Sequence, residues 1–474
     1  MNRWTVLATA LSIALVGSLA VAVQAERAPA LAAATAGGER STITPVLSAR
    51  RVPELVAAPV ADRRLVAHLN DLLAQAPATS CLTVAVSGRV VFSSNPTMPL
   101  VPASVEKLTT AEAALSLLGP SSVFTTSIKG AAAQDGVVDG NLWLVGGGDP
   151  LLMTDPYVAH FKHQPVTHTS LEALADQVVA AGVHEVQGSI QGDESRYDQV
   201  RYNPAWPARF ATEAEVGPLS SLMVNDGLTQ FPPTYNASTP KETPAADPGV
   251  EAANQLTQLL DARGVVIDGP PGASTAPADA PEITKIESQP LDQIVNAMTL
   301  ESDNDTAELL TKELGLHASG AGTTLNGVAA IRQTLQQRNL PIDGTAQVDG
   351  SGLASQDQET CALMQALLDA EGPGSTLANG LPVAGQTGTL DVRFLGTPVV
   401  GRLRAKTGTL NQATALAGYL QTSHGAQMSF AFIMNVPDPQ KITTDQVGLE
   451  DQLGTILDQY PETPDVSALG PKSG

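Results

Sequence analysis

The chain has no excess of basic residues. Its 474 residues include 26 lysines and arginines against 48 aspartates and glutamates, a formal net charge of −22 that is spread along the sequence. This balance argues against nucleic acid and anionic membrane surfaces as partners. Charged residues make up only 16% and hydrophobic residues 43% of the chain. The composition therefore excludes a disordered protein and favours a globular one with two or three domains.

Long hydrophobic runs are missing after the first 25 residues. Within them, Arg3 precedes an apolar run from Trp4 to Val23, and a small-x-small site ends at Ala25. This pattern predicts a signal peptide over 1–25 and hence export. Because the run is about as long as a membrane span needs, a single uncleaved N-terminal membrane anchor is the alternative. In either case we expect the rest of the chain to work outside the cytoplasm, in a secreted, periplasmic or cell-wall location.

Cysteine is limited to Cys81 and Cys361. Export makes them candidates for one disulfide bond, since oxidising compartments let such bonds persist. Two buried free thiols are the alternative.

Composition and hydrophobic periodicity divide the rest of the chain. Residues 26–52 are rich in Ala, Thr, Ser and Pro and predict a linker. Helical and strand patterns then predict a first catalytic segment over 53–122, an inserted and mostly β region over 123–286, a second catalytic segment over 287–465 and a flexible tail over 466–474. The first segment includes a helix that begins at Ser104. The second carries a strand pattern over 403–410 and an antiparallel pair over 413–422 and 428–436, and it ends with a helix that includes Leu449 and Leu457.

The stretch "VPASVEKLTT" places Ser104 and Lys107 three residues apart at this helix start. Both side chains then project from one face, and a lysine with a lowered pKa can serve as the base that a serine nucleophile needs. The pair alone is weak evidence, because an ordinary helix start is equally compatible with it. Ser238 and Lys241 repeat the spacing, but Pro240 between them excludes the helix that would align them.

A second candidate motif is "LESDNDTAELL", where Ser302 and Asn304 fall between two helical patterns. From a short turn these side chains could face a cleft, Ser302 as a proton relay and Asn304 as a partner for a substrate amide. The alternative is a simple helix N-cap, since Ser, Asp and Asn are preferred there.

The third motif is "RAKTGTL" in a strand pattern, with Lys406, Thr407, Gly408 and Thr409. Such an edge can bind an extended peptide that carries a carboxylate, and glycine permits close backbone approach. A protected edge strand with a lysine is the alternative.

Three other sequence patterns do not predict a functional site. "VGGGDP" at 145–150 lacks the Lys and Ser or Thr of a phosphate loop. His160, His163 and His168 have no acidic or cysteine partner at regular spacing, so we expect surface histidines and no metal. "QTGTL" at 386–390 repeats the third motif without its lysine, and we expect a loop or strand that leads toward it.

The three motifs together, once each and in this order, resemble those of the penicillin-recognising serine enzymes, the penicillin-binding proteins and β-lactamases. Ser302 follows Ser104 by 198 residues (302 minus 104), which leaves room for a large insertion. In this the chain is similar to the D-alanyl-D-alanine carboxypeptidases of the PBP4 type, peptidase family S13, as it is in "GNLWLVGGGDPLL", "PLSSLMVNDG", "VDGSGLAS" and "LPVAGQTGTL". The resemblance implies an α/β (α+β) fold: an antiparallel sheet flanked by helices, an all-helical part and a large, mostly β insertion.

The resemblance also implies roles. Ser104 would be acylated by the penultimate D-Ala carbonyl with Lys107 as its base, and the backbone N–H groups of Ser104 and Thr409 would form the oxyanion hole. Ser302 would pass a proton to the leaving D-Ala. No cofactor is implied.

Substrate binding is implied at four positions. Asn304 would hold the substrate amide, and Lys406, Thr407 and Thr409 would hold the terminal carboxylate, with Gly408 between them. Lys406 would also depress the pKa of Lys107. The implied partners are peptidoglycan stem peptides, with β-lactam antibiotics as inhibitors.

Two alternatives stay open. A serine β-lactamase of one class needs a glutamate four residues before the asparagine of a Leu-Asn pair, but Gly322 stands at that distance from Asn326, the only such asparagine between the second and third motifs. A non-catalytic peptidoglycan-binding protein would not need the reactive residues that are present.

Overall fold

The computed structural model describes residues 53–463. The expected signal peptide or anchor (1–25), the linker (26–52) and the tail (466–474) lie outside these residues. Within them, no helix is both long enough and apolar enough to cross a membrane. The α-helices are α2 (Pro53–Leu73), α3 (Lys107–Leu118), α4 (Asp155–Val158), α5 (Leu171–Ala180), α6 (Arg209–Thr212), α7 (Pro248–Asp261), α8 (Leu291–Glu301), α9 (Asn304–Ser319), α10 (Thr324–Gln337), α11 (Cys361–Glu371), α12 (Thr376–Asn379) and α13 (Thr444–Asp458).

Three short 3₁₀ turns and seventeen strands complete the described elements. The turns are η2 (Ala103–Glu106), η3 (Asn225–Gly227) and η4 (Gly388–Leu390). The strands are β1 (Thr79–Val86), β2 (Arg89–Ser94), β3 (Thr125–Gly130), β4 (Val137–Val138), β5 (Leu142–Val145), β6 (Leu152–Met153), β7 (Thr169–Ser170), β8 (Glu185–Val186), β9 (Ile190–Asp193), β10 (Leu228–Gln230), β11 (Thr243–Pro244), β12 (Val266–Ile267), β13 (Gly272–Ala273), β14 (Glu282–Glu287), β15 (Leu403–Thr409), β16 (Ala413–Gln421) and β17 (Gln427–Asn435).

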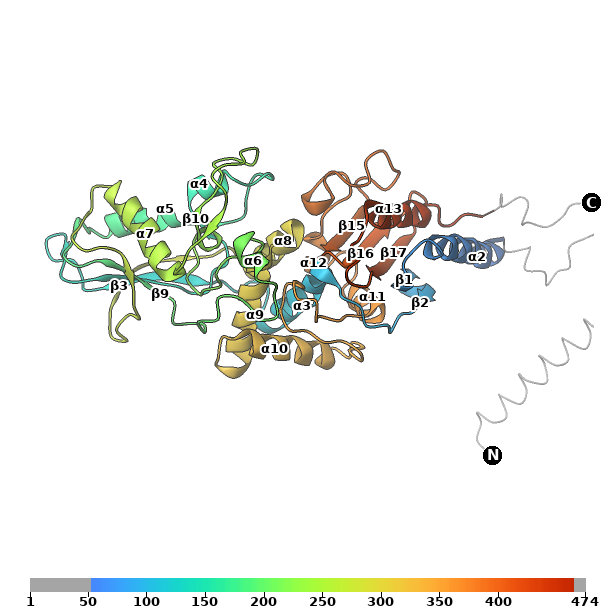
Figure 1. Ribbon diagram of the computed structural model, residues 1–474, viewed down its shortest axis with the longest axis horizontal. Helices are drawn as coiled ribbons and strands as arrows, with labels where there is room; N and C mark the ends of the chain where they lie inside the picture. Colours follow the sequence, from blue (N-terminus) through green and yellow to red (C-terminus); the bar gives the residue numbers. More distant parts are fainter. Residues whose placement is uncertain (1–52, 464–474) are drawn as a thin grey trace, which may run out of the picture. The chain divides into compact units, whose positions relative to one another are not determined.

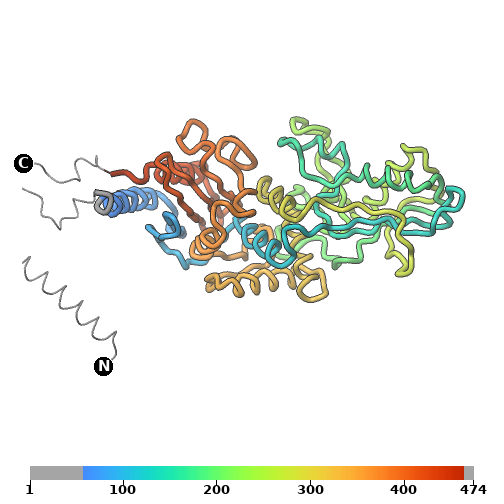
Figure 2. The backbone as a smooth tube through the Cα atoms, turned by 180° about the vertical axis from the view of Figure 1, so that it is seen from behind, coloured from blue at the N-terminus to red at the C-terminus, as the bar shows by residue number. Residues whose placement is uncertain are grey.

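The largest strands form one antiparallel sheet in the order β15-β16-β17-β1-β2. It joins the two ends of the described chain, because β1 pairs with β17 through Cys81 opposite Ile433. Figures 1 and 2 show the blue β1 and β2 beside the red C-terminal strands. The three last strands lie where the sequence predicts them.

Both faces of this sheet are buried along β1, β16 and β17, which explains why these strands are nearly continuously apolar. Along β17, Phe430 and Phe432 pack with residues of α2 and α13, whereas Ala431 and Ile433 pack with residues of α3, α8 and α11. Successive side chains of a strand point to opposite faces, so each face receives its own helical layer. A disulfide bond between Cys81 and Cys361 joins β1 to α11 in the second of these layers.

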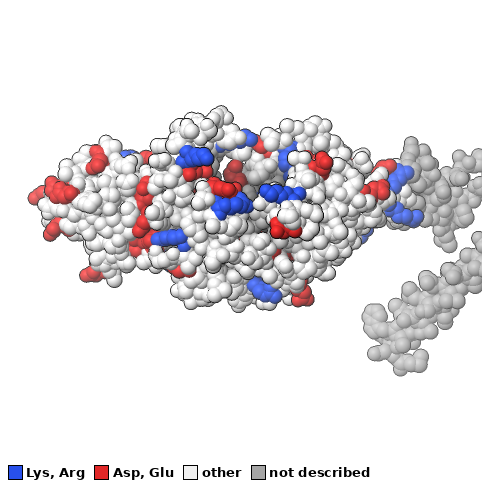
Figure 3. Space-filling model, viewed as in Figure 1, with Lys and Arg blue, Asp and Glu red and all other residues white. Residues whose placement is uncertain are grey.

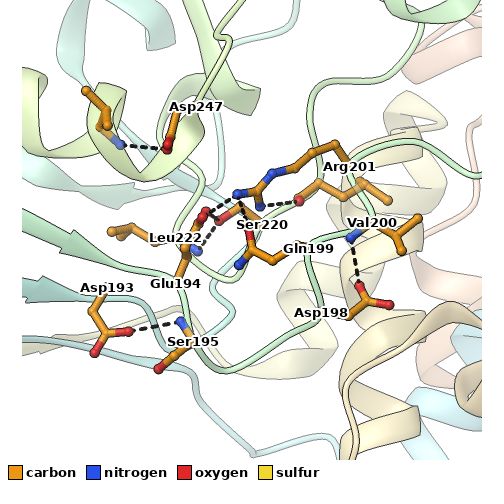
Figure 4. A network of polar contacts seen from close by, with 12 residues as sticks. Asp193, Glu194, Ser195, Asp198, Gln199, Val200, Arg201, Ser220, Leu222 and Asp247 are labelled. Carbon is orange, nitrogen blue, oxygen red and sulfur yellow. Dashed lines mark hydrogen bonds and ion pairs between the residues drawn. The ribbon is translucent and has the colours of Figure 1, made fainter. Parts of the chain in front are cut away.

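Residues 123–286 contain a five-stranded sheet, β13-β9-β5-β3-β14, and a three-stranded sheet, β12-β8-β4. Helices α5 and α7 pack against these strands, so the region mixes helices and strands more evenly than the expected mostly β module. Figure 4 shows one of its polar networks, where Glu194 pairs with Arg201 and accepts a hydrogen bond of 2.7 Å from Ser220 Oγ. This network ties the segment after β9 to the segment before η3.

The inserted region is anchored to α9 of the catalytic segment. Arg196 donates to the Glu313 carboxylate, with Nε to Oε2 at 2.9 Å, and Tyr197 donates to the same oxygen at 2.8 Å. Lys312, which is fully buried, pairs with Asp198. The described residues from Ala57 onward form one compact unit, and the inserted region can contribute to a site in the catalytic segments.

Candidate active site

Ser104 and Lys107 lie at the junction of η2 and α3. The 3₁₀ turn carries Ser104, and α3 begins at Lys107, three residues later. Lys107 Nζ lies 3.0 Å from Ser104 Oγ, 2.7 Å from Asn304 Oδ1 and 2.8 Å from the Ser351 carbonyl oxygen. The lysine side chain is fully buried, so these three oxygens are its hydrogen-bond partners.

The three partners are of two kinds. An amide oxygen and a backbone carbonyl can only accept hydrogen bonds, whereas the Ser104 hydroxyl can also donate. A neutral lysine amine has two N–H bonds and one lone pair. When Asn304 and Ser351 take the two N–H bonds, the lone pair faces the Ser104 hydroxyl, which is the arrangement a general base requires.

The environment of Lys107 makes this neutral form more accessible than it is for a lysine in water. Burial lowers its pKa to about 8, against the opposing attraction of Asp349, Asp303, Glu308 and Glu106. Burial also raises the pKa of Glu308 to about 8 and raises that of Glu106 well above its usual value. These carboxyl groups therefore carry less negative charge and attract the Lys107 ammonium less strongly.

The loop that presents the Ser351 carbonyl is organised by Asp349. Its carboxylate accepts hydrogen bonds from the backbone N–H groups of Ser351, Gly352 and Ala354 at 3.1, 2.7 and 2.8 Å, and from Trp206 Nε1 at 2.7 Å. Trp206 belongs to the inserted region. The aspartate of the loop "VDGSGLAS" thus holds the loop in its conformation.

The described residues contain one group of carboxylates that could hold a metal ion. Oxygens of Glu106, Asp349 and Asp357 lie within 4.8 Å of one another, and all three side chains are buried. Burial raises the pKa of Glu106 well above its usual value and that of Asp357 to about 10. Both shifts favour the protonated, uncharged form of these two carboxyl groups.

The second motif forms a turn between α8 and α9. Ser302 follows α8 in the left-handed region, with φ 61°, and Asp303 is the N-cap of α9, accepting from the Thr306 N–H at 3.2 Å. The capping function therefore belongs to Asp303. The side chains of Ser302 and Asn304 are left for the site, where Ser302 Oγ accepts from Lys406 Nζ at 2.8 Å.

The third motif lies on β15, next to the turn that carries Ser104. A Cβ atom on Gly408 would lie 2.6 Å from the Pro102 carbonyl oxygen and 3.1 Å from the Ser104 nitrogen. Only glycine permits this approach of the strand to the turn. Thr407 Oγ1 lies 2.8 Å from Thr389 Oγ1, and Lys406 Nζ also donates to the Thr407 carbonyl oxygen at 2.8 Å.

Lys406 is fully buried as well. Burial lowers its pKa well below the usual value, and repulsion by Lys107 lowers it further. The causes that act on Lys107 are burial and neighbouring carboxylates, so in this structure the repulsion between the lysines bears on Lys406. The expectation that Lys406 depresses the pKa of Lys107 stays a prediction.

These residues border a cavity of about 820 Å³. Its lining includes Ser104, Ser302, Asn304, Thr407 and Thr409, with Arg209, Phe210 and Glu215 from the inserted region and Arg393 and Lys441 from the second catalytic segment. Figure 3 shows a hollowed face with basic and acidic side chains around the hollow. All three motifs thus meet at one cavity, and the buried amines of Lys107 and Lys406 contact the Ser104 and Ser302 side chains that line it.

Several contributors to this site were not predicted from the sequence. The Glu215 carbonyl oxygen accepts from Asn304 Nδ2 at 2.7 Å, and the Gly217 N–H donates to Asp305 Oδ1 at 2.8 Å. The inserted region therefore holds the turn that carries Asn304. Thr389, in η4 of "QTGTL", lies against Thr407, and the similarity of this stretch to the third motif was the available signal.

The second serine-lysine pair and the three histidines, for which no site was expected, can also be located. Ser238 and Lys241 are exposed in a segment outside regular structure. His168 contacts the Val166 carbonyl oxygen. His160 and His163, however, contact carboxylates that are distant in sequence: Glu242 for His160, and Glu301 and Asp391 for His163.

The chain is similar in sequence to known proteins. The model of the D-Ala-D-Ala carboxypeptidase 3 (S13) family matches residues 65–247 and 232–453. Carboxypeptidase DacB of Mycolicibacterium smegmatis is 31% identical over 403 residues, which are 82% of this chain and 84% of that protein. A D-alanyl-D-alanine carboxypeptidase of Actinomadura sp. is 27% identical over 423 residues, 74% of this chain and 76% of that protein.

A solved structure extends the comparison to three dimensions. Penicillin binding protein 4 from Haemophilus influenzae superposes with a TM-score of 0.69 over 83% of this chain and 99% of that one, at 19% identity. At this identity the likeness establishes the fold: an antiparallel sheet between helical layers with a large insertion.

Proposed function

The chain belongs to the D-Ala-D-Ala carboxypeptidase 3 (S13) family of serine peptidases, and we propose that it removes the terminal D-Ala of peptidoglycan stem peptides through an acyl-enzyme on Ser104. The observation that carries this proposal is the pairing of Lys107 Nζ with Ser104 Oγ, while Asn304 and Ser351 occupy the other two positions around the amine. A buried base with its lone pair directed at one hydroxyl selects that hydroxyl as the nucleophile.

Substrate binding begins with the terminal carboxylate. Lys406, Thr407 and Thr409 bind it at the edge of β15, and Asn304 holds the amide of the stem peptide. Burial lowers the pKa of Lys406 in the free enzyme. An arriving carboxylate opposes this shift and favours the ammonium form that binds it.

Acylation then proceeds at Ser104. Its oxygen forms a bond to the carbonyl carbon of the penultimate D-Ala while Lys107 takes the hydroxyl proton. The backbone N–H groups of Ser104 and Thr409 stabilise the oxyanion. The C–N bond to the terminal D-Ala breaks as Ser302 relays to the leaving amine the proton that Lys107 took, which returns Lys107 to its neutral form. Water, activated by the same base, releases the shortened peptide.

The same chemistry extends to related substrates. A cross-link whose leaving amine belongs to a neighbouring stem peptide would be cleaved by the same steps, which makes endopeptidase activity the companion of carboxypeptidase activity. β-Lactams would acylate Ser104 and act as inhibitors. Such substrates place the enzyme outside the cytoplasm, in the cell-wall or periplasmic space, after export directed by residues 1–25 or with that segment as an anchor.

A fluorescent penicillin tests this function. We expect covalent, long-lived labelling of the wild type and none of Ser104→Ala, because that variant lacks the nucleophile. Ser238→Ala is the matched control, since Ser238 has the same spacing to a lysine but lies exposed outside regular structure, and it should label like the wild type.

Other outcomes would replace the proposal. Rapid release of the label would indicate a β-lactamase, and absence of labelling in the folded wild type would indicate a non-catalytic binding protein. Mass spectrometry of products from defined muropeptides then distinguishes loss of a terminal D-Ala from cleavage of a cross-link.

A further inference from the structure

His163 lies in the inserted region between α4 and β7, and it contacts two carboxylates from different parts of the catalytic segments. Its Nδ1 lies 2.9 Å from both carboxylate oxygens of Glu301, and its Nε2 lies 3.0 Å from Asp391 Oδ2. The imidazole is 28% exposed, so it is partly shielded and still open to protons. Both ring nitrogens therefore face acceptors, which a histidine can satisfy fully only as the doubly protonated cation.

The two carboxylates flank catalytic groups. Glu301 is the last residue of α8 and directly precedes Ser302. Asp391 directly follows η4, which carries Thr389 against Thr407.

Close packing joins these two elements behind the site. A Cβ atom on Gly388 of η4 would lie 2.2 Å from the Leu300 carbonyl oxygen of α8. A shift of either element therefore moves the other.

Glu301 is also part of a wall between two cavities. It lines the catalytic cavity of about 820 Å³ together with Ser302 and Thr389, and it lines a neighbouring cavity of about 590 Å³ together with His163. The contact between His163 and Glu301 thus lies at the boundary of the site.

From this arrangement we propose that His163 is a positioning residue: its protonated ring holds Glu301 and Asp391 together and thereby orients Ser302 and Thr389 in the catalytic cavity. The inference rests on the proposed function. The inserted region would then contribute to catalysis in two ways. One is the hydrogen bond that the Glu215 carbonyl accepts from Asn304. The other is the positive charge of His163, which is gained or lost with pH.

The charges around His163 make its protonation decisive. Glu301 and Asp391 face it directly, Lys162 pairs with Asp391 and lies near the Tyr235 ring, and Asp303 lines the same cavity. When His163 is protonated, it and Lys162 place two positive charges beside the carboxylates of Glu301 and Asp391. With His163 neutral, one ring nitrogen presents a lone pair to a carboxylate oxygen, and that contact becomes repulsive.

This predicts a definite sign for the pH dependence. Burial opposes the charged ring, but the hydrogen bonds and attraction from Asp391 and Glu301 prevail and raise the pKa of His163. A folded-state pKa above the unfolded one means that the stabilisation is fully present below the unfolded pKa and is lost as the pH rises through the folded pKa. His163 should therefore support the site in acidic and neutral solution and contribute little at alkaline pH.

Two substitutions test the role on the full chain. His163→Gln keeps hydrogen bonding but loses the charge, and we expect acylation by fluorescent penicillin to slow about fivefold near pH 6 and to match the wild type within about twofold near pH 9. His163→Arg keeps a cation at every pH, so it should restore the rate near pH 6. His168→Gln, in the same segment but without a carboxylate contact, is the control and should leave both rates unchanged.

A second readout does not depend on catalysis. The melting temperature of the wild type minus that of His163→Gln should be positive near pH 6 and shrink toward zero near pH 9. A rate ratio and a melting difference that are both independent of pH, or a failure of His163→Arg to restore the rate, would overturn the proposal. Failure of the wild type to react with penicillin would instead contradict the proposed function. The melting comparison would still test whether protonated His163 stabilises its contacts with Glu301 and Asp391.

Discussion

Three lysines in the described part of the chain are fully buried, and they fall into two regions that differ in their partners. Lys312, where α9 meets the inserted region, pairs with the carboxylate of Asp198. Lys107 and Lys406, at the catalytic cavity, donate to hydroxyl, amide and carbonyl oxygens, all of them neutral.

The difference shows how one residue type serves two purposes. A carboxylate partner compensates the charge of a buried ammonium and makes it a structural anchor, and removing one member of such a pair is strongly destabilising. Neutral acceptors satisfy the N–H bonds without stabilising the charge to the same extent, so burial can shift the amine toward its free base. Reactive lysines are therefore distinguished here by the charge of their partners, since burial is common to all three.

The same substitution at the two kinds of lysine gives the largest contrast. Lys107→Met should slow acylation by about a thousandfold, because the base that accepts the serine proton is lost. Lys312→Met should label at the wild-type rate, since Lys312 contacts residues of the inserted region and lies outside the catalytic cavity. Stopped-flow labelling of both folded variants measures this, and equal rates would break the distinction.

The anchoring pair can be tested from its other side. Asp198→Asn leaves the Lys312 ammonium buried without its compensating charge and should lower the free energy of unfolding by about 3 kcal/mol. Lys312→Met removes the charge and leaves Asp198, whose side chain is 28% exposed, in contact with water, so we expect a smaller loss. Urea unfolding of both variants gives the two values, and the reverse order would contradict the view of Lys312 as a charged anchor.

Lys406 offers a finer test, because its proposed ligand is a carboxylate. Lys406→Met should reduce kcat/KM about thirtyfold for a peptide ending in D-Ala-D-Ala, in line with the loss of one charged hydrogen bond. A peptide with the same sequence and a C-terminal amide should be affected by less than about threefold. Equal losses on both peptides would show that Lys406 does not recognise the carboxyl end.

The sequence predicts the two kinds of lysine unequally well. Ser104 and Lys107 lie close in the chain, so their helical spacing alone brings them together, and the Ser302–Asn304 turn and the Lys406 strand were recognisable as patterns. Strands β1, β2 and β15 to β17 were also predictable, because their apolar or alternating runs are long. No local pattern marks Lys312, whose partner Asp198 lies 114 residues earlier.

The remaining contributors leave no residue-specific signal. The partners that orient Lys107 and Asn304 from outside the motifs are the carbonyl oxygens of Ser351 and Glu215, which any residue could supply. Their position depends on how distant loops pack. The contacts of His163 were missed for a related reason, since regular spacing was sought along the chain while Glu301 and Asp391 follow it by 138 and 228 residues. Helices α5 and α7 were missed because short strands and turns dominate the pattern of the inserted region.

The pH dependence of acylation tests most directly whether Lys107 acts as a free base. Burial lowers its pKa to about 8, so the reactive neutral amine becomes more abundant as the pH rises toward that value. The account predicts that the labelling rate increases by about one decade per pH unit from near pH 6 and levels off above about pH 8, a change far larger than the effect expected from His163. A rate that stays constant or falls over this range would contradict it.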